Sequence, residues 1–331
     1  MQHQRNDTLD MIKLFASYMV VFIHVKFSGE FGLAIAALAR FAVPLFFLVS
    51  GFYSYKITTE KVKKRIAHIF CLLIFAEGIY CLYDVLSLLL KQTPQEIIPY
   101  LYQYVKPIKL LKLLVINAPI HTVHLWYLWA ILYVYVILYF VVKWKIPDKL
   151  VFIVSLLALL LHLFLGEFLL AFKVDLSSNF VRNFALTGIP FFGLGMLAKK
   201  YSQKLCAIPA YVIVGCAIFG IAEVLLSWFF WGKNELYLGS LGILFSLTAI
   251  FVKYPNIKYP SILNSLTGCS TYIYILHLMV SGIMGKVYAV AGLDMSSSVI
   301  LKMIHPFAVC IFSTVTAYIF VRIERRLKKK A

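Results

Sequence analysis

Long apolar runs separated by short polar segments recur along the whole chain, and this pattern predicts helices that span a membrane. A helix needs about 20 mainly apolar residues to cross a bilayer, whereas the strands of a membrane barrel are shorter and alternate in hydrophobicity. The runs are long and continuous, so we predict an all-α fold with about ten transmembrane helices. They cover residues 8–27, 33–55, 66–90, 122–142, 150–172, 184–198, 208–231, 236–252, 268–291 and 299–321.

The composition of the chain supports a membrane location. Hydrophobic residues make up 62% of the 331 residues, and charged residues make up only 14%. A soluble globular protein is about half apolar and about a quarter charged. Because a water-soluble core could not bury so much apolar surface, lipid must cover much of it. We therefore predict a polytopic membrane protein that forms a single integral membrane domain over residues 1–331, without a separate soluble domain.

The basic residues set the expected orientation and partners. The net charge is +18, and lysine and arginine gather in alternate loops, as in residues 56–65, and in the tail after residue 321. Cytoplasmic loops are enriched in basic residues, so both termini are predicted to be cytoplasmic. The same residues are dispersed between the spans rather than gathered on one face. This argues against nucleic acid as a partner and favours contact with anionic lipid headgroups of the bilayer.

The segment 94–117 does not fit the pattern of spans, because prolines and lysines interrupt its apolar residues. Two interpretations stay open for it. The segment is either an amphipathic element on the outer leaflet that lies over the site, or an ordinary long loop.

Two ionisable residues, Lys13 and His24, lie inside the first apolar run. They are eleven residues apart, so at about 100° per residue they share one helix face, about 16 Å apart along the axis. Asp10 lies close to the same face. Charged groups inside spans usually face a bundle interior or a wet cavity, so this face is predicted to be a polar stripe. Two structural alternatives stay open: Lys13 as a snorkelling anchor, and His24 as a histidine bonded to a neighbouring helix.

Further polar residues are predicted to lie at a similar depth on other spans. Because such groups need a common polar environment, they predict a shared cavity that opens outward. The second span also carries Arg40, for which Glu223 is a possible ion-pair partner. His121 and His124 have the spacing of two metal ligands on one helical turn, but no third ligand is evident and we predict no metal site. The predicted cavity residues are His121, His124, Trp126, Arg182, Asn183, Glu223 and His277.

Five stretches of the sequence, taken in order, resemble one protein family across essentially the whole chain. The first is a basic residue followed by ten residues and a histidine, here Lys13 and His24 after RNDTLD. The others are RFAVPLFFLVSGFYSYK at 40–56, HLWYL at 124–128, RNFALTGIPFFGLG at 182–195 and TYIYILH at 271–277. This pattern resembles acyltransferase family 3, and within it the sequence is most similar to the membrane half of vancomycin-resistance serine racemases.

The resemblance implies an activity and assigns roles to residues. Members of this family usually move an acyl group, often acetyl, from cytoplasmic acyl-CoA to a hydroxyl of an envelope glycan or another molecule. The resemblance implies that His24 is the catalytic base, since a neutral imidazole can take the hydroxyl proton as the oxygen attacks the thioester. Arg40 is then expected to stabilise the oxyanion, and Lys13 to pair with a phosphate of CoA.

The first inner loop departs from the family pattern. Many members carry Arg-x-x-Arg there, whereas this chain has KVKKRIAH, in which His68 takes the place of the second arginine after Arg65. Lys63, Lys64 and Arg65 still make a basic cluster that can bind an anion, so we predict that they contact the donor. A plain cytoplasmic anchor is the alternative.

Three functions stay open at this point. The first is an O-acyltransferase, most simply an O-acetyltransferase, that uses acyl-CoA as co-substrate without a tightly bound cofactor and acts on a carbohydrate-containing acceptor outside the cytoplasm. The second is a transporter of a small polar solute such as serine, and the third is a structural membrane partner. The family resemblance, together with the lack of a cleavage site after the first run, predicts a bacterial inner-membrane protein. Homo-oligomerisation stays open.

Overall fold

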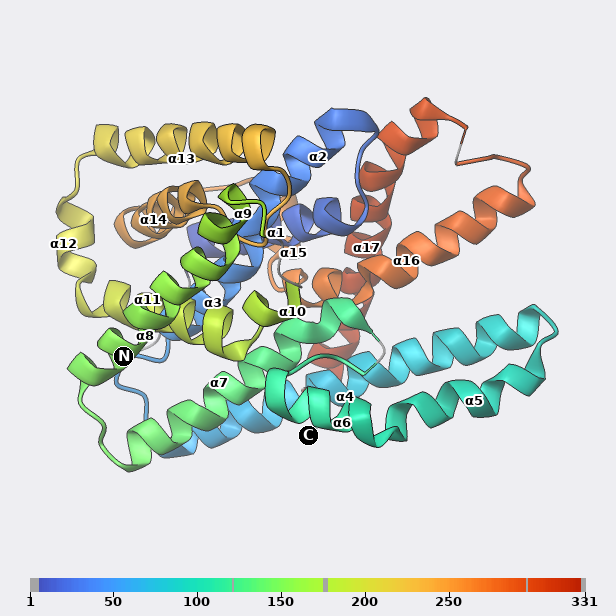
Figure 1. Ribbon diagram of the computed structural model, residues 1–331, viewed down its shortest axis with the longest axis horizontal. Coiled ribbons are helices and arrows are strands. Elements are labelled where there is room, and N and C mark those ends of the chain that lie inside the picture. Colours follow the sequence, from blue (N-terminus) through green and yellow to red (C-terminus); the bar gives the residue numbers. More distant parts are fainter. Residues whose placement is uncertain (1–5, 121, 175–177, 296, 329–331) are drawn as a thin grey trace. The chain divides into compact units, whose positions relative to one another are not determined.

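The computed structural model describes residues 6–120, 122–174, 178–295 and 297–328, and every regular element in these ranges is a helix (Figure 1). The all-α prediction is therefore confirmed. The chain divides into two compact units: a terminal unit made of Met1–Phe46 and Tyr201–Ala331, and a central unit made of Phe47–Lys200. That the two units work as a single membrane domain stays a prediction.

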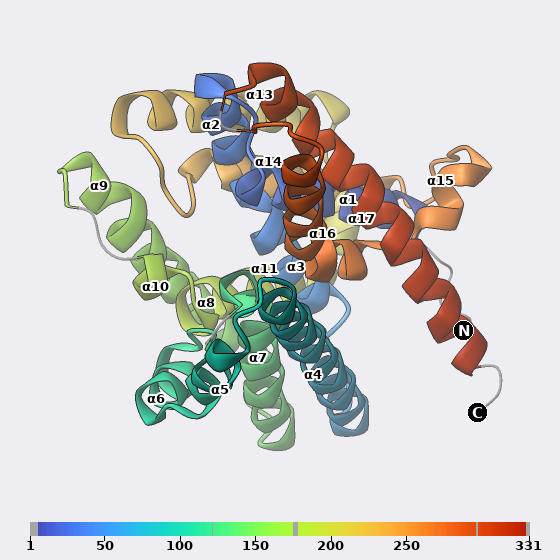
Figure 2. The same ribbon diagram turned by 90° about the vertical axis from the view of Figure 1, so that its right-hand side faces the viewer.

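The terminal unit combines the start of the chain with its C-terminal part. Helix α3 (Ala42–Phe52) begins in this unit and ends in the central unit. Helix α1 packs against α14, α16 and α17, and α16 lies along α17 (Figure 2). The other elements of this unit are α1 (Asp7–His24), α2 (Gly29–Leu38), the 3-10 turn η1 (Ala39–Phe41), α12 (Ser202–Ala207), α13 (Ala210–Trp231), α14 (Leu238–Lys253), α15 (Ser261–Leu266), α16 (Ser270–Val290) and α17 (Val299–Lys328).

The central unit is built around two helix pairs, α4 with α7 and α8 with α11. Short helical turns connect these pairs. The main helices are α4 (Thr59–Leu90), α7 (Trp126–Lys143), α8 (Asp148–Leu163) and α11 (Ile189–Lys200). The shorter elements are η2 (Pro94–Glu96), α5 (Ile97–Tyr102), η3 (Gln103–Val105), α6 (Pro107–Ile116), η4 (Val123–Leu125), η5 (Phe164–Phe168), α9 (Leu169–Ala171), α10 (Ser178–Val181) and η6 (Phe184–Gly188).

Seven helical segments in the described part of the chain are long and apolar enough to cross a membrane. Three predicted spans fall outside this group. The first forms α1, whose 18 residues include three charged side chains, and the run at 236–252 forms the 16-residue α14. The run at 184–198 is divided between η6 and α11. The count of ten spans and the cytoplasmic termini therefore stay predictions. The seven segments are Gly29–Phe52, Thr59–Leu90, Val123–Lys143, Asp148–Ala171, Ala210–Trp231, Ser270–Val290 and Val299–Arg326.

The sequence of α1 explains where this helix begins and which face it buries. The side chain of Asn6 caps the helix by accepting a hydrogen bond from the backbone N–H of Leu9 at 2.8 Å. Two turns apart, Leu14 and Val21 point into one apolar cluster, which includes Ile273 of α16. Burial of this stripe holds α1 against α16 and turns the polar positions of the helix away from the cluster.

Helices α13 and α14 approach closely because glycines line their contact. A Cβ on Gly220 would meet the carbonyl oxygen of Gly239, and a Cβ on Gly239 would meet that of Gly220. One turn further, a Cβ on Gly242 would lie 2.8 Å from the carbonyl oxygen of Cys216. Small residues at such positions allow two helix backbones to come together in a membrane. This close contact fixes the start of α14, which follows the loop 232–237, against the middle of α13.

The segment 94–117 folds into short helices rather than an extended loop. Tyr100 of α5 donates a hydrogen bond to Oδ2 of Asp84 on α4 at 2.9 Å, so α5 runs beside the end of α4 (Figure 1). Apolar side chains such as Ile98 and Leu114 are exposed on this segment, at 79% and 67%. The exposed apolar surface agrees with an amphipathic element, and its place on the outer leaflet stays a prediction.

Candidate active site

Helix α1 carries both residues of the first sequence motif. The helix is continuous from Asp7 to His24, so Lys13 and His24 lie about 16 Å apart along one axis. Its first turn is fixed to the loop after α14, where the hydroxyl of Thr8 donates to the carbonyl of Tyr254 at 2.5 Å. The helix is thus held at the end that carries Lys13, and His24 is its last residue.

The ammonium group of Lys13 pairs with a carboxylate one helical turn away. Its Nζ lies 2.6 Å from Oδ1 of Asp10, and the two side chains are 28% and 19% exposed. A partly exposed pair of this kind stabilises a protein by at most about 1 kcal/mol, so a stronger anion can replace Asp10. The two roles predicted for Lys13, membrane anchor and donor contact, both stay predictions.

His24 has an exposed side chain, and a second histidine lies beside it. The ring centroids of His24 and His277 are 5.4 Å apart, and the ring planes are inclined by 40°. His277 belongs to α16 and is fully buried. The structure therefore brings together two histidines that the sequence placed in separate motifs.

Hydrogen bonds hold the buried ring of His277 in one orientation. Its Nδ1 lies 2.8 Å from the carbonyl oxygen of Tyr274 and 3.2 Å from that of Ile273. Because a carbonyl oxygen only accepts, Nδ1 carries the hydrogen, and Nε2 is the acceptor nitrogen of the neutral ring. The backbone of α16 thus fixes the ring against which His24 lies.

Arg40 forms an ion pair with Glu235. Its Nη1 lies 2.7 Å from Oε2 of Glu235, and the two side chains are only 10% and 11% exposed. A carboxylate at this distance offsets the cost of burying the guanidinium group. The partner of Arg40 is thus Glu235, and not Glu223, which the sequence offered as a possibility. The sequence signal for Glu235 was a single acidic residue in the short loop between two apolar runs.

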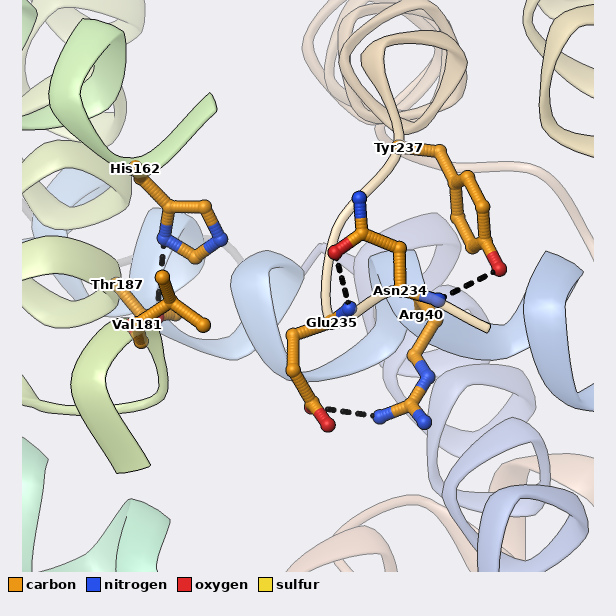
Figure 3. A network of polar contacts seen from close by, with 7 residues as sticks. All are labelled: Arg40, His162, Val181, Thr187, Asn234, Glu235 and Tyr237. Atoms are coloured by element: carbon orange, nitrogen blue, oxygen red, sulfur yellow. Dashed lines mark hydrogen bonds and ion pairs between the residues drawn. The ribbon is translucent and has the colours of Figure 1, made fainter. Parts of the chain in front are cut away.

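The loop 232–237 holds Glu235 in place through its own hydrogen bonds (Figure 3). The hydroxyl of Tyr237 accepts from the backbone N–H of Asn234 and donates to the carbonyl of Gly232, each at 3.0 Å. The side chain of Asn234 accepts from the backbone N–H of Glu235 at 2.7 Å. Gly232 has a φ of +86°, a conformation that favours glycine. The carboxylate is therefore presented to Arg40 by a structured turn.

Glu223, a predicted cavity residue, joins two helices of the terminal unit. Its Oε1 accepts a hydrogen bond from Ser227 at 2.5 Å, and its Oε2 accepts from the backbone N–H of Gly239. Gly239 lies in the first turn of α14, where unpaired N–H groups and the helix dipole favour a negative charge. Glu223 therefore caps α14 from α13. Its predicted role in a cavity stays a prediction.

Two lysines that the sequence analysis did not single out, Lys26 and Lys233, are exposed. Lys26 follows His24 by two residues, and Lys233 precedes Glu235 by two. Both lysines therefore lie next in sequence to residues of the candidate site.

In the central unit, Arg65 is bound by neutral oxygen atoms. Its Nη1 donates to the hydroxyls of Ser54 at 2.6 Å and Tyr135 at 3.1 Å, and its Nη2 donates to the carbonyl of Tyr53 at 2.9 Å. These contacts hold the start of α4 against α7 and the end of α3. None of these three partners carries a negative charge, so the positive charge of Arg65 is not neutralised by them.

Lys63 and Lys64 precede Arg65 on α4, and both are exposed. The Nζ of Lys63 lies 5.6 Å from the centre of the ring of Tyr139, a cation–π contact that orders its long side chain. The predicted basic cluster therefore has two exposed cations and one arginine that is fixed by hydrogen bonds. That these residues contact the donor stays a prediction.

Three predicted cavity residues lie at or next to the starts of α7 and η6. The guanidinium of Arg182 lies 5.7 Å from the centre of the ring of Trp126, a buried residue. Asn183 caps η6 by accepting hydrogen bonds from the backbone N–H groups of Ala185 and Leu186, each at 2.9 Å. Trp126 and Arg182 thus lie together, while the side chain of Asn183 serves the local backbone.

Two described histidines of the central unit, His124 and His162, lie in structural contacts. His124 is 2% exposed, and its ring meets the ring of Tyr80 edge to face at 5.0 Å. His121, with which it was paired in sequence, lies outside the described residues. His162 contacts Thr187, whose hydroxyl donates to the carbonyl of Val181 at 2.8 Å (Figure 3). A cavity shared by all predicted residues of both units stays a prediction.

The family model of the acyltransferase domain that defines acyltransferase family 3 matches residues 6–327. The chain belongs to acyltransferase family 3. The match includes α1 with His24, the Arg40–Glu235 pair and the basic cluster of α4, so it covers residues of both units. No curated protein and no solved structure matches the chain at a significant level. Family membership and the seven apolar helices together support a multi-pass membrane acyltransferase.

Proposed function

We propose that this protein is an O-acyltransferase that moves an acyl group, most simply acetyl, from cytoplasmic acyl-CoA to a hydroxyl of a carbohydrate-containing acceptor outside the cytoplasm. Family membership supports the reaction class. The observation that carries the proposal is the exposed imidazole of His24 at the end of α1, beside the fixed ring of His277. A bacterial inner membrane is the proposed location.

His24 is the proposed general base. Its imidazole takes the proton of the acceptor hydroxyl while the oxygen attacks the thioester carbonyl. The tetrahedral intermediate then expels the thiolate of CoA, which receives that proton from the imidazolium, so an ester and free CoA are formed. His24 is the last residue of α1, and the negative end of a helix dipole stabilises a cation there. The helix therefore favours the imidazolium that forms during the reaction.

His277 acts in this proposal as a positioning residue. Its ring is held by the carbonyl of Tyr274 and packs beside the ring of His24. An exposed histidine at a helix end would otherwise sample several rotamers. The fixed neighbour limits these rotamers, and a limited set of orientations favours proton transfer in the reactive geometry.

Arg40 is the proposed oxyanion stabiliser. Glu235 engages one terminal nitrogen of its guanidinium. A guanidinium has five N–H donors, so others are left to address the negative charge that develops on the thioester oxygen. Glu235 keeps the guanidinium in one orientation, which is the condition for such stabilisation without reorganisation.

Lys13, Lys63 and Lys64 are the proposed contacts of the acyl-CoA phosphates. Lys13 lies at the other end of the helix that carries His24, and its partner Asp10 is exchangeable because the pair is partly exposed. Lys63 and Lys64 are exposed next to Arg65, whose charge adds to the local positive potential. In this proposal the charges of these lysines attract the phosphates of the donor.

The proposal is tested with the full chain purified into proteoliposomes. Acetyl-CoA labelled in the acetyl group is supplied with methyl glucoside and methyl glucuronide as soluble hydroxyl acceptors, and the release of CoA and labelled ester is measured. Uptake of labelled serine is measured on the same preparation. The expected result is CoA release with ester formation. Serine uptake without any acetyl-CoA turnover would reject the enzyme in favour of a transporter.

A further inference from the structure

In the central unit, the start of α4 and the end of α7 each place a lysine over the same aromatic ring. The Nζ of Lys63 on α4 lies 5.6 Å from the centre of the ring of Tyr139, and the Nζ of Lys143 on α7 lies 5.9 Å from the same centre. A cation over an aromatic face is attracted by the negative potential of that face. Both lysines are exposed, so solutes reach their ammonium groups. Tyr139 therefore brings one cation of each helix to a common place.

A third cation lies one helical turn further along the same pair of helices. Tyr135 precedes Tyr139 by four residues, about 6 Å along α7. The guanidinium of Arg65 lies 5.7 Å from the centre of the ring of Tyr135, and its Nη1 donates to the hydroxyl of that residue at 3.1 Å. Nη1 also donates to Ser54, a residue that is only 1% exposed. The two lysines thus lie at the edge of a polar junction, and Arg65 lies inside it.

The charges of these three residues are not offset by acidic side chains. Among the residues that the structure describes, no carboxylate forms an ion pair with Lys63, Arg65 or Lys143. Glu60, one turn before Lys63 on α4, is exposed, and its Oε1 accepts a hydrogen bond from Thr59 at 2.8 Å. Charges of one sign that line a common site raise the local concentration of the opposite charge. The junction of α4 and α7 therefore favours an anion.

The arrangement of the three cations indicates what kind of anion fits. Arg65 makes three hydrogen bonds to neutral oxygens, which leaves two of its five N–H donors for a ligand. A single phosphate can contact the two exposed lysines but leaves the charge of Arg65 unmatched. Two linked phosphates extend further, so one can contact the lysines while the other accepts from Arg65. The start of α4 is also the end predicted to face the cytoplasm, where nucleotides are found.

We infer that Lys63, Lys143 and Arg65 form a site for the diphosphate of the donor nucleotide, in which Lys143 is the contact supplied by α7. This inference rests on the proposed function, because it takes acyl-CoA as the donor. The central unit then recognises the nucleotide part of the donor. CoA thioesters are therefore better substrates than thioesters of pantetheine, which carry no phosphate, and free CoA competes with acyl-CoA for this site.

The test measures binding of the donor's parts separately from acyl transfer. Calorimetry with the full chain in phosphatidylcholine nanodiscs compares CoA, dephospho-CoA, which keeps the diphosphate but lacks the 3′-phosphate, and pantetheine. Lys63→Gln and Lys143→Gln are each expected to weaken binding of CoA and dephospho-CoA about two- to fivefold, the effect of one exposed charge, and to leave pantetheine unchanged. A loss that is seen with CoA but not with dephospho-CoA would place the 3′-phosphate at these lysines and contradict the inference.

Further variants separate this site from the general charge of the surface. Lys145→Gln removes an exposed lysine two residues beyond Lys143 that lies over neither tyrosine ring, so CoA binding is expected to stay unchanged. Tyr139→Leu removes the ring that orders both lysines and is expected to weaken CoA binding, whereas Tyr139→Phe keeps the aromatic face and is expected to recover it. Equal weakening by Lys145→Gln and Lys143→Gln, with unchanged melting temperatures, would overturn the inference.

Exposed lysines also contact the phosphates of anionic lipids, so a second arm uses phosphatidylglycerol nanodiscs. If Lys63→Gln and Lys143→Gln reduce only the thermal stabilisation by phosphatidylglycerol and leave CoA binding unchanged, the cluster is a lipid contact and the inference is wrong. Acetyl transfer by Lys143→Gln with the wild-type KM for acetyl-CoA would also reject the site and leave the proposed function standing. CoA binding that depends on Lys143 in a protein without acetyl transfer would reject the proposed function instead.

Discussion

Arg40 of the terminal unit and Arg65 of the central unit are both partly or largely buried arginines near a sequence motif, yet their partners differ. Arg40 pairs with the carboxylate of Glu235 at 2.7 Å and belongs to η1, which packs against α1. Arg65 is held by two hydroxyls and a carbonyl. The guanidinium of Arg40 is held in one orientation and its charge is offset by Glu235, which suits the proposed stabilisation of the oxyanion. The guanidinium of Arg65 is also held in one orientation, but its three neutral partners leave its charge available to attract an anion.

Arg40→Gln is expected to have the largest effect among variants that separate the two arginines. Removing a preorganised oxyanion donor typically lowers kcat about 10²- to 10³-fold. Arg65→Gln is expected to raise KM for acyl-CoA with little change in kcat, because it acts through charge at the donor. Steady-state kinetics with acetyl-CoA measure both values. The opposite result, in which Arg40→Gln changes KM for acyl-CoA and Arg65→Gln changes kcat, would contradict the roles assigned to the two arginines.

Substitutions of His277 test whether its fixed ring positions the imidazole of His24. His277→Leu is expected to lower kcat about ten- to a hundredfold with KM unchanged, since a misplaced catalytic group loses about this much. His277→Asn keeps a donor for the carbonyl of Tyr274 and is expected to recover part of the activity. Kinetics and melting temperature are measured together. Equal loss in both variants, in parallel with lower stability, would show a purely structural role.

A substitution at Gly220 tests the close contact of α13 with α14, the helix that follows the loop carrying Glu235. Gly220→Ala places a Cβ against the backbone of Gly239, and such overpacking costs about 1–3 kcal/mol. Gly215→Ala on the same helix meets no atom within 4 Å, and replacing a helical glycine by alanine favours the helix by about 0.5–1 kcal/mol. Thermal unfolding in detergent should therefore shift in opposite directions. A common direction would refute the close contact of α13 and α14.

The exposed lysines of the central unit should show the smallest effect. Lys63→Gln and Lys64→Gln are each expected to raise KM for acyl-CoA about two- to fivefold, because exposed charges contribute little. The effect should shrink at high salt, which screens exposed charges. Lys91→Gln is the matched control, since Lys91 follows the other end of α4, about 40 Å away. An equal change of KM in Lys91→Gln would show that the start of α4 does not bind the donor specifically.

The helical architecture and the shared helix of Lys13 and His24 were predictable from sequence, because apolar run length and helical periodicity are local properties. The contact of His24 with His277 and the ion pair of Arg40 with Glu235 were not predictable in this way. Glu235 lies 195 residues from Arg40 in the chain, and periodicity does not tell which distant loop reaches a given face. The sequence also could not show that Asn183 and Glu223 serve as helix caps.

The central claim is that His24 is the base that accepts the acceptor proton, and one substitution tests it directly. His24→Ala is compared with wild type and with His305→Gln, in which the amide keeps a hydrogen-bonding partner for Ser281. Acetyl transfer to the soluble saccharides and the melting temperature are measured for each. The account predicts that His24→Ala loses about 10²- to 10⁴-fold in transfer rate with an unchanged melting temperature, while His305→Gln stays active. Transfer at the wild-type rate by His24→Ala would contradict the account.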